Sequence, residues 1–431
     1  MEIKQLKNER LREEMLYAKH DSGLSVYVFP KKGFSKYYAI YGTDYGSVDR
    51  VFQVPGETEM TTVPDGIAHY LEHKMFEEEG GGNAFDRFAA TGASSNAFTS
   101  FDMTAYLFTC TNRFYENLEI LLDFVNHPYF TEENVAKEQG IIGQEIKMYE
   151  DDPEWRVFFN TLTAMFHNNP VKIDIAGTVE SISQITPKVL YQCYHTFYNP
   201  ANMVLVLVGD VDMEKALRCV DKYVDASRNL GKVERPQVEE PQERVQEYIE
   251  QELMVSQPMF RIGFKDNQMA VSGDAMLKKE IATELILETA FGKTSDFYME
   301  LYEAGLIDNT FDAEADITKA YGFSLIGGES KDPGAVYEKV KERLRSLQEN
   351  GIPAEELSRA RKVLKSGNIR IFNNVESMGN AFIRHIFAGY QPLMVGDMVD
   401  SVTEEEVALR LKEHFDTENS VLSVIRPAQG E

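Results

Sequence analysis

Two histidines and a glutamate lie within one short segment of this chain, His69-Tyr70-Leu71-Glu72-His73. Residues four apart on an α-helix share one face, so both imidazole rings could bind the same metal ion. Glu72, on the same turn, could then act on a water molecule beside that ion. The order His-x-x-Glu-His is the reverse of the commoner His-Glu-x-x-His signature of zinc hydrolases. The segment therefore predicts a zinc-dependent hydrolase.

The residues around this segment favour a metal site over a chance pattern. Short motifs do arise by chance, and exposed helices contain many His and Glu residues. Here, however, residues 64–66 are turn and N-cap types, and Ile67, Leu71 and Met75 recur every four positions. This spacing predicts a packed helix whose two histidines lie near its apolar stripe. Half-buried imidazoles need a partner, and a metal ion would supply it.

A third metal ligand must come from elsewhere, because hydrolytic zinc sites usually have three protein ligands and an open fourth position. The sequence predicts a long helix over 131–149, with Thr131 as its N-cap. Glu138 and Glu145 are seven residues apart and would point within ~20° of each other. One carboxylate could bind the metal while the other orients a histidine ring. For an isolated pair of glutamates an exposed acidic face is the favoured alternative, but the upstream motif favours ligation.

The ordered set of motifs resembles the pitrilysin (insulinase, M16) family of zinc metallopeptidases. Besides the His-x-x-Glu-His segment, Glu138 and Glu145, three further segments are similar to family landmarks: an opening strand at 21–26, an edge strand at 92–99 and a closing strand at 197–210. The similarity spans nearly the whole chain, and the length suits the short subfamily of single half-shells. It is greatest to a bacterial subgroup whose genes tend to lie beside that of a related protein without the metal motif.

The resemblance implies one Zn²⁺ ion per chain, bound by His69, His73 and Glu145. Glu72 would serve as general base and return the proton to the leaving amine. Glu138 would orient a ligand or the attacking water.

The resemblance also implies where a peptide substrate binds. An extended peptide would add to the strand edge at Asn96, Ala97 and Phe98 through main-chain hydrogen bonds. For Asn96 by itself, an ordinary turn or strand-end asparagine is an equal alternative.

One departure from the family concerns the substrate carbonyl. The C-terminal half of family members usually has an Arg and a Tyr that stabilise the oxyanion, but the matching positions here are Tyr302 and a position near Ile307. Losing such donors costs ~10²–10³ in rate. We therefore expect a homologous M16-type partner subunit, without the metal motif, to supply the pair in a heterodimer. A homodimer is the alternative.

Composition sets further bounds. A chain of 431 residues is too long for one typical core and predicts two domains or more. Its net charge of −26 argues against nucleic acid and against an anionic membrane surface as partners, and it would favour cationic or neutral peptides by steering. No apolar run approaches the ~20 residues that span a bilayer. Three scattered cysteines and an N-terminus without a signal-peptide pattern predict a cytoplasmic location.

The chain also contains a weak internal repeat. We expect an N-terminal catalytic domain at 1–227, a polar linker at 228–257 and an inactive C-terminal domain at 258–431. Segments 67–71 and 92–98 match 281–285 and 305–311, a spacing of roughly 215 to 220 residues. The second copy places Thr283, Ile286 and Leu287 where the first has His69, Glu72 and His73. It has lost the metal-binding residues and would serve as a wall or substrate platform.

The fold class follows from the order of the expected elements. Strands followed by helices in each half indicate two homologous α+β domains built on antiparallel sheet. The resemblance implies the same arrangement, the metallohydrolase fold of LuxS and the mitochondrial processing peptidases. Expected strands are 26–29, 37–41 and 104–109, and expected helices are 66–78, 85–90, 114–125, 131–149, 278–290, 333–349 and 354–365.

Two classes of function remain at this stage. The first is a zinc endopeptidase that cleaves peptides held extended in an enclosed chamber. The second is a non-catalytic scaffold or assembly subunit of a peptide-processing complex. The intact motif together with Glu145 favours the first, because a scaffold has no reason to keep a base beside a metal site.

Overall fold

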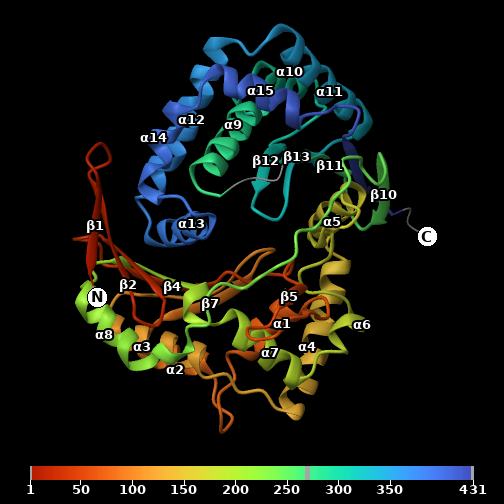
Figure 1. The fold of residues 1–431 in the computed structure, drawn as a ribbon. Helices are drawn as coiled ribbons and strands as arrows, with labels where there is room; N and C mark the ends of the chain where they lie inside the picture. Colours follow the sequence, from red (N-terminus) through yellow and green to blue (C-terminus); the bar gives the residue numbers. More distant parts are fainter. Residues whose placement is uncertain (1, 267–271, 429–431) are drawn as a thin grey trace.

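The structure is a computed structural model that describes residues 2–266 and 272–428. It consists of two α+β units that face each other, the N-terminal one coloured red to green and the C-terminal one green to blue in Figure 1. The first unit contains a sheet with the strand order β1-β2-β3-β9-β4-β8-β7. Its strands are Ile3–Asn8 (β1), Glu13–Lys19 (β2), Ser25–Pro30 (β3), Tyr37–Thr43 (β4), Ser94–Thr99 (β7), Thr104–Cys110 (β8) and Met203–Gly209 (β9), and a separate hairpin pairs Val51–Gln53 (β5) with Met60–Thr62 (β6).

The second sheet repeats the topology of the first. Its strand order is β10-β14-β11-β13-β12, which corresponds to β3-β9-β4-β8-β7 of the first sheet. In each of these two sets the first pair (β3/β9 and β10/β14) is parallel, and the other pairs are antiparallel. Its strands are Tyr248–Leu253 (β10), Met259–Lys265 (β11), Asp312–Ile317 (β12), Gly322–Glu329 (β13) and Val421–Pro427 (β14). The predicted internal duplication is confirmed by this shared order.

One detail of the predicted repeat is wrong. The sequence match placed the second copy of edge strand β7 at 305–311, whereas that copy is β12 at Asp312–Ile317. Residues 305–311 instead form the turn that precedes β12, and Gly305 has a positive φ of 66°. Gly305, which the sequence match aligned with Gly92, follows the end of a helix and is not part of a strand.

The seven predicted helices are all present. The helices of the N-terminal unit are Ile67–Lys74 (α1), Ala84–Thr91 (α2), Phe114–Asn126 (α3), Glu132–Glu150 (α4), Pro153–Met165 (α5), Val179–Ile182 (α6), Pro187–Phe197 (α7) and Met213–Tyr223 (α8). Those of the C-terminal unit are Asp274–Phe291 (α9), Asp296–Glu303 (α10), Pro333–Asn350 (α11), Ala354–Ile371 (α12), Val375–Ala388 (α13), Val395–Ser401 (α14) and Glu404–His414 (α15). The predicted helices correspond to α1, α2, α3, α4, α9, α11 and α12, and the other helices of the described residues are not among those predicted. Short 3-10 turns lie at Pro170–Lys172, Pro200–Asn202, Ala226–Arg228 and Pro392–Met394. Helix α1 ends at Lys74, four residues before its predicted end, because the chain then turns into the glycine-rich loop at 80–82.

The two units exchange one helix each across their interface. Helix α13 of the C-terminal unit packs on β4 and β9 of the first sheet, and α5 of the N-terminal unit packs on β11 and β14 of the second. Phe382 of α13 lies against Phe29 with ring centroids 4.4 Å apart. Each sheet is therefore covered by helices on both faces, which explains why every residue of β9 is buried. This exchange fixes how the two units face each other.

The predicted linker at 228–257 contains a strand that the sequence analysis did not expect. β10, at Tyr248–Leu253, is the outermost strand of the second sheet, and its side chains alternate between exposed and half-buried. An edge strand buries little surface, so its Glu and Gln residues concealed the period of two. The remainder of the range has little regular structure. The domain boundaries themselves stay a proposal.

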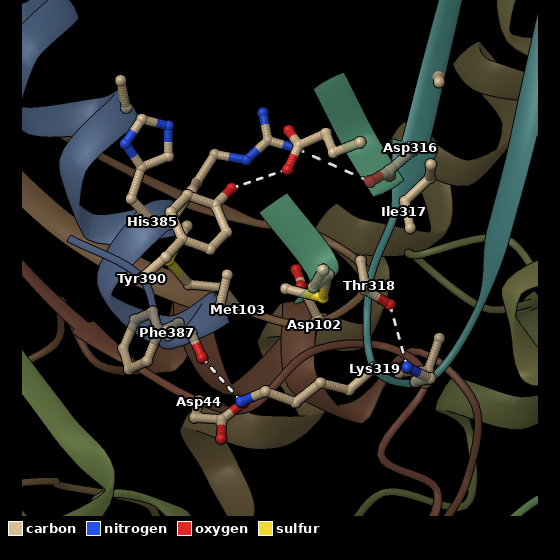
Figure 2. A pocket seen from close by; sticks show the side chains of 18 of the residues that line it. Asp44, Asp102, Met103, Asp316, Ile317, Thr318, Lys319, His385, Phe387 and Tyr390 are labelled. Carbon is tan, nitrogen blue, oxygen red and sulfur yellow. Dashed lines mark hydrogen bonds and ion pairs between the residues drawn. The ribbon is translucent and has the colours of Figure 1, made fainter. Parts of the chain in front are cut away.

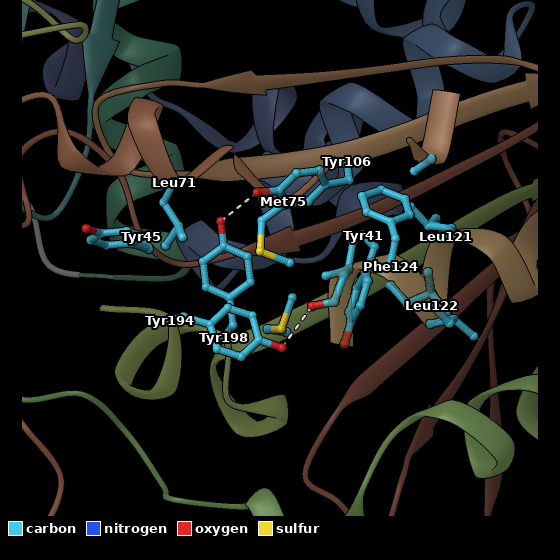
Figure 3. Close-up of a cluster of buried hydrophobic side chains, with 14 of the residues drawn as sticks. Tyr41, Tyr45, Leu71, Met75, Tyr106, Leu121, Leu122, Phe124, Tyr194 and Tyr198 are labelled. Carbon is cyan, nitrogen blue, oxygen red and sulfur yellow. Dashed lines mark hydrogen bonds between the residues drawn. The ribbon is translucent and has the colours of Figure 1, made fainter. Parts of the chain in front are cut away.

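A cluster of large buried side chains supports α1 from below (Figure 3). Leu71 and Met75 lie in this cluster, together with Tyr106 and Tyr198, whose hydroxyl groups are 2.8 Å apart. Because this face of α1 is fixed in the core, the opposite face, with His69 and His73, is held in a fixed orientation.

Candidate metal centre

Helix α1 begins at a glycine that the local geometry requires. Gly66 has a φ of 85°, and a Cβ atom at this position would lie 2.3 Å from the carbonyl oxygen of Ala176. Only glycine fits such a turn against a neighbouring backbone. The turn allows the helix to start directly before the metal motif and to bury Leu71 while His69 and His73 face α4.

Helix α4 supplies the two glutamates. It begins with a capping box in which Thr131 and Asn134 satisfy each other's backbone N–H groups. The Tyr70 hydroxyl of α1 donates a hydrogen bond to the carbonyl of Val135 on α4, so the two helices are joined close to the motif. Glu138 and Glu145 then project toward α1 from consecutive parts of one face.

The side chains of His69, His73 and Glu145 converge. Nε2 of His69 lies 3.7 Å from Oε1 of Glu145, and Nε2 of His73 lies 3.5 Å from Oε2 of the same carboxylate. One ligand atom from each residue can be chosen so that all three lie within 4.8 Å of one another. The 3.5 and 3.7 Å separations are long for hydrogen bonds but close to the ~3.4 Å between ligands of a tetrahedral zinc ion with bonds of ~2.0–2.2 Å. The residues present fit Zn²⁺.

The protonation state of His69 also suits a metal ligand. Burial and the neighbouring His73 lower the pKa of His69 to about 3, so the ring is neutral at physiological pH. Its Nδ1 atom is buried and has no hydrogen-bond partner among the residues that the structure describes. A neutral imidazole is the form that binds zinc, and Nε2 is the ring nitrogen of His69 that faces Glu145.

His73 is oriented by Glu138. Nδ1 of His73 lies 3.1 Å from Oε1 of Glu138, which fixes the ring with Nε2 toward Glu145. Burial disfavours a charged His73, but the hydrogen bond with Glu138 and the charges of Glu72 and Glu145 outweigh it and raise its pKa. The surrounding carboxylates thus favour a positive charge at this place, which a metal ion would supply instead of a proton.

Glu72 lies beside the three converging groups and is 8% exposed. It accepts a hydrogen bond of 2.7 Å from the Thr99 hydroxyl at the end of β7. Burial is the largest influence on this carboxyl and raises its pKa to about 7. A carboxyl that titrates near neutral pH is suited to take up a proton and release it again.

Three residues of this site were not predicted from the sequence. They are Thr99, Tyr149, whose hydroxyl donates a 2.9 Å hydrogen bond to Oε1 of Glu145, and Lys74. Lys74 is completely buried, and its ammonium forms ion pairs with Glu77 at 2.8 Å and Glu138 at 3.7 Å. The spacing of Tyr149, one turn after Glu145, and the acids around Lys74 could have indicated these two. Nothing local marks Thr99, because only the fold brings it to Glu72.

The predicted substrate strand forms an open edge next to the site. β7 pairs with β8 on one side and is the last strand of its sheet, and α1 packs against it. Asn96 is exposed, and Ala97 and Phe98 are half-buried. The structure thus places these residues where an added strand could pair with them.

Two residues match the positions at which the family usually has its oxyanion donors. Tyr302 is half exposed on α10 and stacks on Tyr298, with ring centroids 5.9 Å apart, while Ile307 is buried. Neither side chain offers a guanidinium, and Ile307 has no hydroxyl.

Comparison with known proteins identifies the family. Residues 57–179 match the family model described as insulinase (peptidase family M16), and residues 184–364 match the model described as the peptidase M16 inactive domain. The chain is 42% identical over 435 residues to the uncharacterized zinc protease YmfH of Bacillus subtilis, and the match covers 99% of each chain. The chain belongs to the M16 family.

Other similar proteins agree with this assignment. The zinc protease YmxG of Bacillus subtilis is 24% identical over 389 residues, which are 86% of this chain and 91% of that one. An M16-like peptidase from Alicyclobacillus acidocaldarius superimposes with a TM-score of 0.92 at 35% identity, covering 98% of this chain and 100% of its own. A protease from Helicobacter pylori, 18% identical, shares the fold with a TM-score of 0.80 over 96% of this chain and 100% of its own. The predicted fold of two M16-type α+β domains is therefore confirmed.

Among the residues that the structure describes, no helix combines the length and the apolar character that crossing a bilayer requires.

Proposed function

We propose that this chain is a zinc-dependent endopeptidase. The observation that supports this most strongly is the convergence of His69, His73 and Glu145 on one point, with the carboxyl of Glu72 next to it. The zinc-protease names of the M16 relatives agree with it.

Each residue would have a distinct task. His69, His73 and Glu145 would hold one Zn²⁺ ion, which would polarise the substrate carbonyl and lower the pKa of water. Glu72 would accept the proton from the attacking water and pass it to the leaving amine. Glu138 keeps the His73 ring in place, and Tyr149 does the same for the Glu145 carboxylate.

The substrate would be a peptide in an extended conformation. Asn96, Ala97 and Phe98 lie on the open edge of β7. Thr99, the next residue of this strand, donates a hydrogen bond to Glu72, so a peptide paired with β7 would have a peptide bond close to Glu72. Recognition by main-chain hydrogen bonds depends only loosely on sequence.

The assembly is part of the proposal. Since Tyr302 and Ile307 replace the expected oxyanion donors, we infer that a homologous M16-type subunit without the metal motif completes the site in a heterodimer, with a homodimer as the alternative. The domain division at 1–227, 228–257 and 258–431 and the cytoplasmic location are likewise proposals.

The test is a Glu72→Gln variant analysed for zinc and for cleavage of a quenched fluorescent peptide library, in the presence of the partner subunit. Zinc content measured by mass spectrometry should stay at one ion per chain, while cleavage falls by ~10²–10⁴. Glu79→Gln, on the exposed loop after the motif, is the matched control and should cleave normally. Normal cleavage by Glu72→Gln would remove Glu72 from the chemistry, and zinc-free wild-type protein would favour the scaffold alternative.

A further inference from the structure

A cavity of about 350 Å³ lies between the two units (Figure 2). Its walls come from the loop after β4 and the turn after β7 in the N-terminal unit, and from α9, β12 and α13 in the C-terminal unit. Interfaces between domains are preferred places for ligand sites. None of the residues assigned to catalysis above lines this cavity.

The lining contains more carboxyl groups than cationic side chains. Its carboxylates are Asp44, Asp49, Asp102, Glu280, Glu284 and Asp316, and its cationic side chains are Arg235, Lys319 and Arg384. Arg235 forms ion pairs with Asp49 and, at 3.8 Å, with Asp44, so these two carboxylates already share a cationic partner. The Lys319 ammonium donates to the carbonyl of Phe387 at 2.7 Å.

The remaining carboxylates are only partly satisfied. Asp316 lies 4.0 Å from Arg384, whose side chain is 69% exposed, and accepts a 3.0 Å hydrogen bond from the Tyr321 hydroxyl. Asp102 accepts a 3.0 Å hydrogen bond from Ser100, and Glu280 accepts one of 2.8 Å from Tyr390. Glu284, one turn after Glu280 on α9, has no hydrogen bond or ion pair with any residue that the structure describes. Burial, with a smaller contribution from Glu280, raises the pKa of Glu284 to about 8, and burial raises that of Asp316 to about 6. A cation in the cavity would relieve both carboxyls.

The spacing of these carboxylates favours an organic cation over a metal ion. Within the described part of the chain, a group of three or more His, Cys, Asp or Glu ligand atoms within 4.8 Å of one another occurs at His69, His73 and Glu145, and not in this cavity. The cavity also has apolar lining from Met103, Met276 and Ile317. Carboxylates around an apolar wall suit the aliphatic stem and charged end of a lysine or arginine side chain.

The cavity lies close to the end of β7 in the sequence, where a peptide paired with this strand would continue. Thr99, the last residue of β7, donates to Glu72, and Asp102 follows it by three residues and lines the cavity. Three residues of extended chain span at most ~11 Å. A peptide that extends past Thr99 would therefore bring one of its side chains to the cavity within a few residues of the cleaved bond.

We propose that this cavity is a substrate subsite that binds the ammonium or guanidinium group of a peptide, with Glu284 and Asp316 as its main determinants and Asp102 and Glu280 beside them. The inference rests on the proposed peptidase function and adds the class of substrate. It gives the C-terminal unit, which has lost the metal-binding residues, a direct part in specificity.

The test measures binding without cleavage. Full-length, zinc-loaded Glu72→Gln protein is titrated into acetylated fluorescent peptides of neutral sequence with a single Arg at successive positions, and into a Gln counterpart of each. At one or two positions, Arg should tighten binding about tenfold at low salt. A non-acetylated Gln peptide tests the amino terminus as the source of the cation.

The variant Glu284→Gln/Asp316→Asn, which keeps side-chain shape, should reduce the Arg preference to about twofold or less. Glu288→Gln/Asp312→Asn is the matched control, because these residues lie on the same two elements but do not line the cavity. If only the non-acetylated Gln peptide binds more tightly than the acetylated peptides, the cavity binds the amino terminus of the peptide, which supports the proposal. Equal binding of all peptides, or an equal loss of preference in both double variants, would overturn it.

Failure of this inference can be told apart from failure of the proposed function. Cleavage by the Glu72-containing chain without any Arg preference would leave the peptidase intact and remove the subsite. Arg-selective binding without cleavage in any assembly would do the reverse.

Discussion

At the residue scale, the site depends on a carboxylate that orients His73 and on a buried ammonium that balances the charge of this carboxylate. Glu138 contacts both Nδ1 of His73 and the ammonium of Lys74, so one carboxylate is held from two sides. Lys74 is completely buried, which is costly for a lysine without paired acids. This arrangement fixes the direction of His73 Nε2 before any metal binds.

Glu138→Gln tests this orientation directly. The amide keeps the shape of the side chain but weakens its hold on His73 Nδ1, so zinc affinity should fall by ~10–100-fold in competition with a chelator. The exposed Glu133→Gln on the same helix is the control and should bind zinc as the wild type does. Unchanged affinity of Glu138→Gln would show that the hydrogen bond to His73 has no role in metal binding.

The site residues that could be predicted from the sequence are those with helical spacing. His69, Glu72, His73, Glu138 and Glu145 are brought together by the four- and seven-residue periods of two helices. Thr99 could not be found in this way, because its contact with Glu72 depends on how an edge strand packs against a helix.

At the scale of elements, the exchanged helices decide how the two units are joined. Helix α13 crosses the first sheet at Gly379, where a Cβ atom would lie 2.3 Å from the ring of Tyr38. This helix is not among those predicted from the sequence, because nothing in its apolar pattern shows that its partner is the sheet of the other unit. Likewise, the sequence of β10 resembles a polar linker, because an edge strand at the surface lacks a strong apolar period.

Gly379→Ala should therefore destabilise the protein. The methyl group would force α13 away from Tyr38, at a cost of about 1–3 kcal/mol in the free energy of unfolding, measured with urea. Gly367→Ala, on exposed α12 with no atom near the added methyl group, should instead stabilise by up to about 1 kcal/mol. Equal effects of the two substitutions would contradict the close packing of α13 on the first sheet.

At the scale of the whole molecule, the two copies share a sheet topology but differ in their metal-binding residues. The N-terminal unit has the converging histidines and glutamates, and the C-terminal unit repeats its sheet while the matching helix α9 has Thr283, Ile286 and Leu287 buried in their place. Two α+β domains were predictable from the repeat. Their mutual arrangement was not, since it depends on contacts between residues more than a hundred positions apart.

In the proposed assembly, the division of labour would extend to a second chain. Because Tyr302 and Ile307 cannot stabilise an oxyanion as an Arg and a Tyr would, the isolated chain should cleave peptides slowly, and a homologous subunit without the metal motif should raise kcat/KM by ~10²–10³. The same partner added to Glu72→Gln should give no comparable increase. Full activity of the isolated chain would exclude a shared active site.

The most direct measurement is an anomalous difference map, collected at the zinc absorption edge from crystals of the zinc-loaded chain. We predict one peak, ~2.0–2.2 Å from Nε2 of His69, Nε2 of His73 and a carboxylate oxygen of Glu145. A map without density between these three side chains, with Glu145 turned to solvent, would contradict the zinc site and the peptidase function built on it.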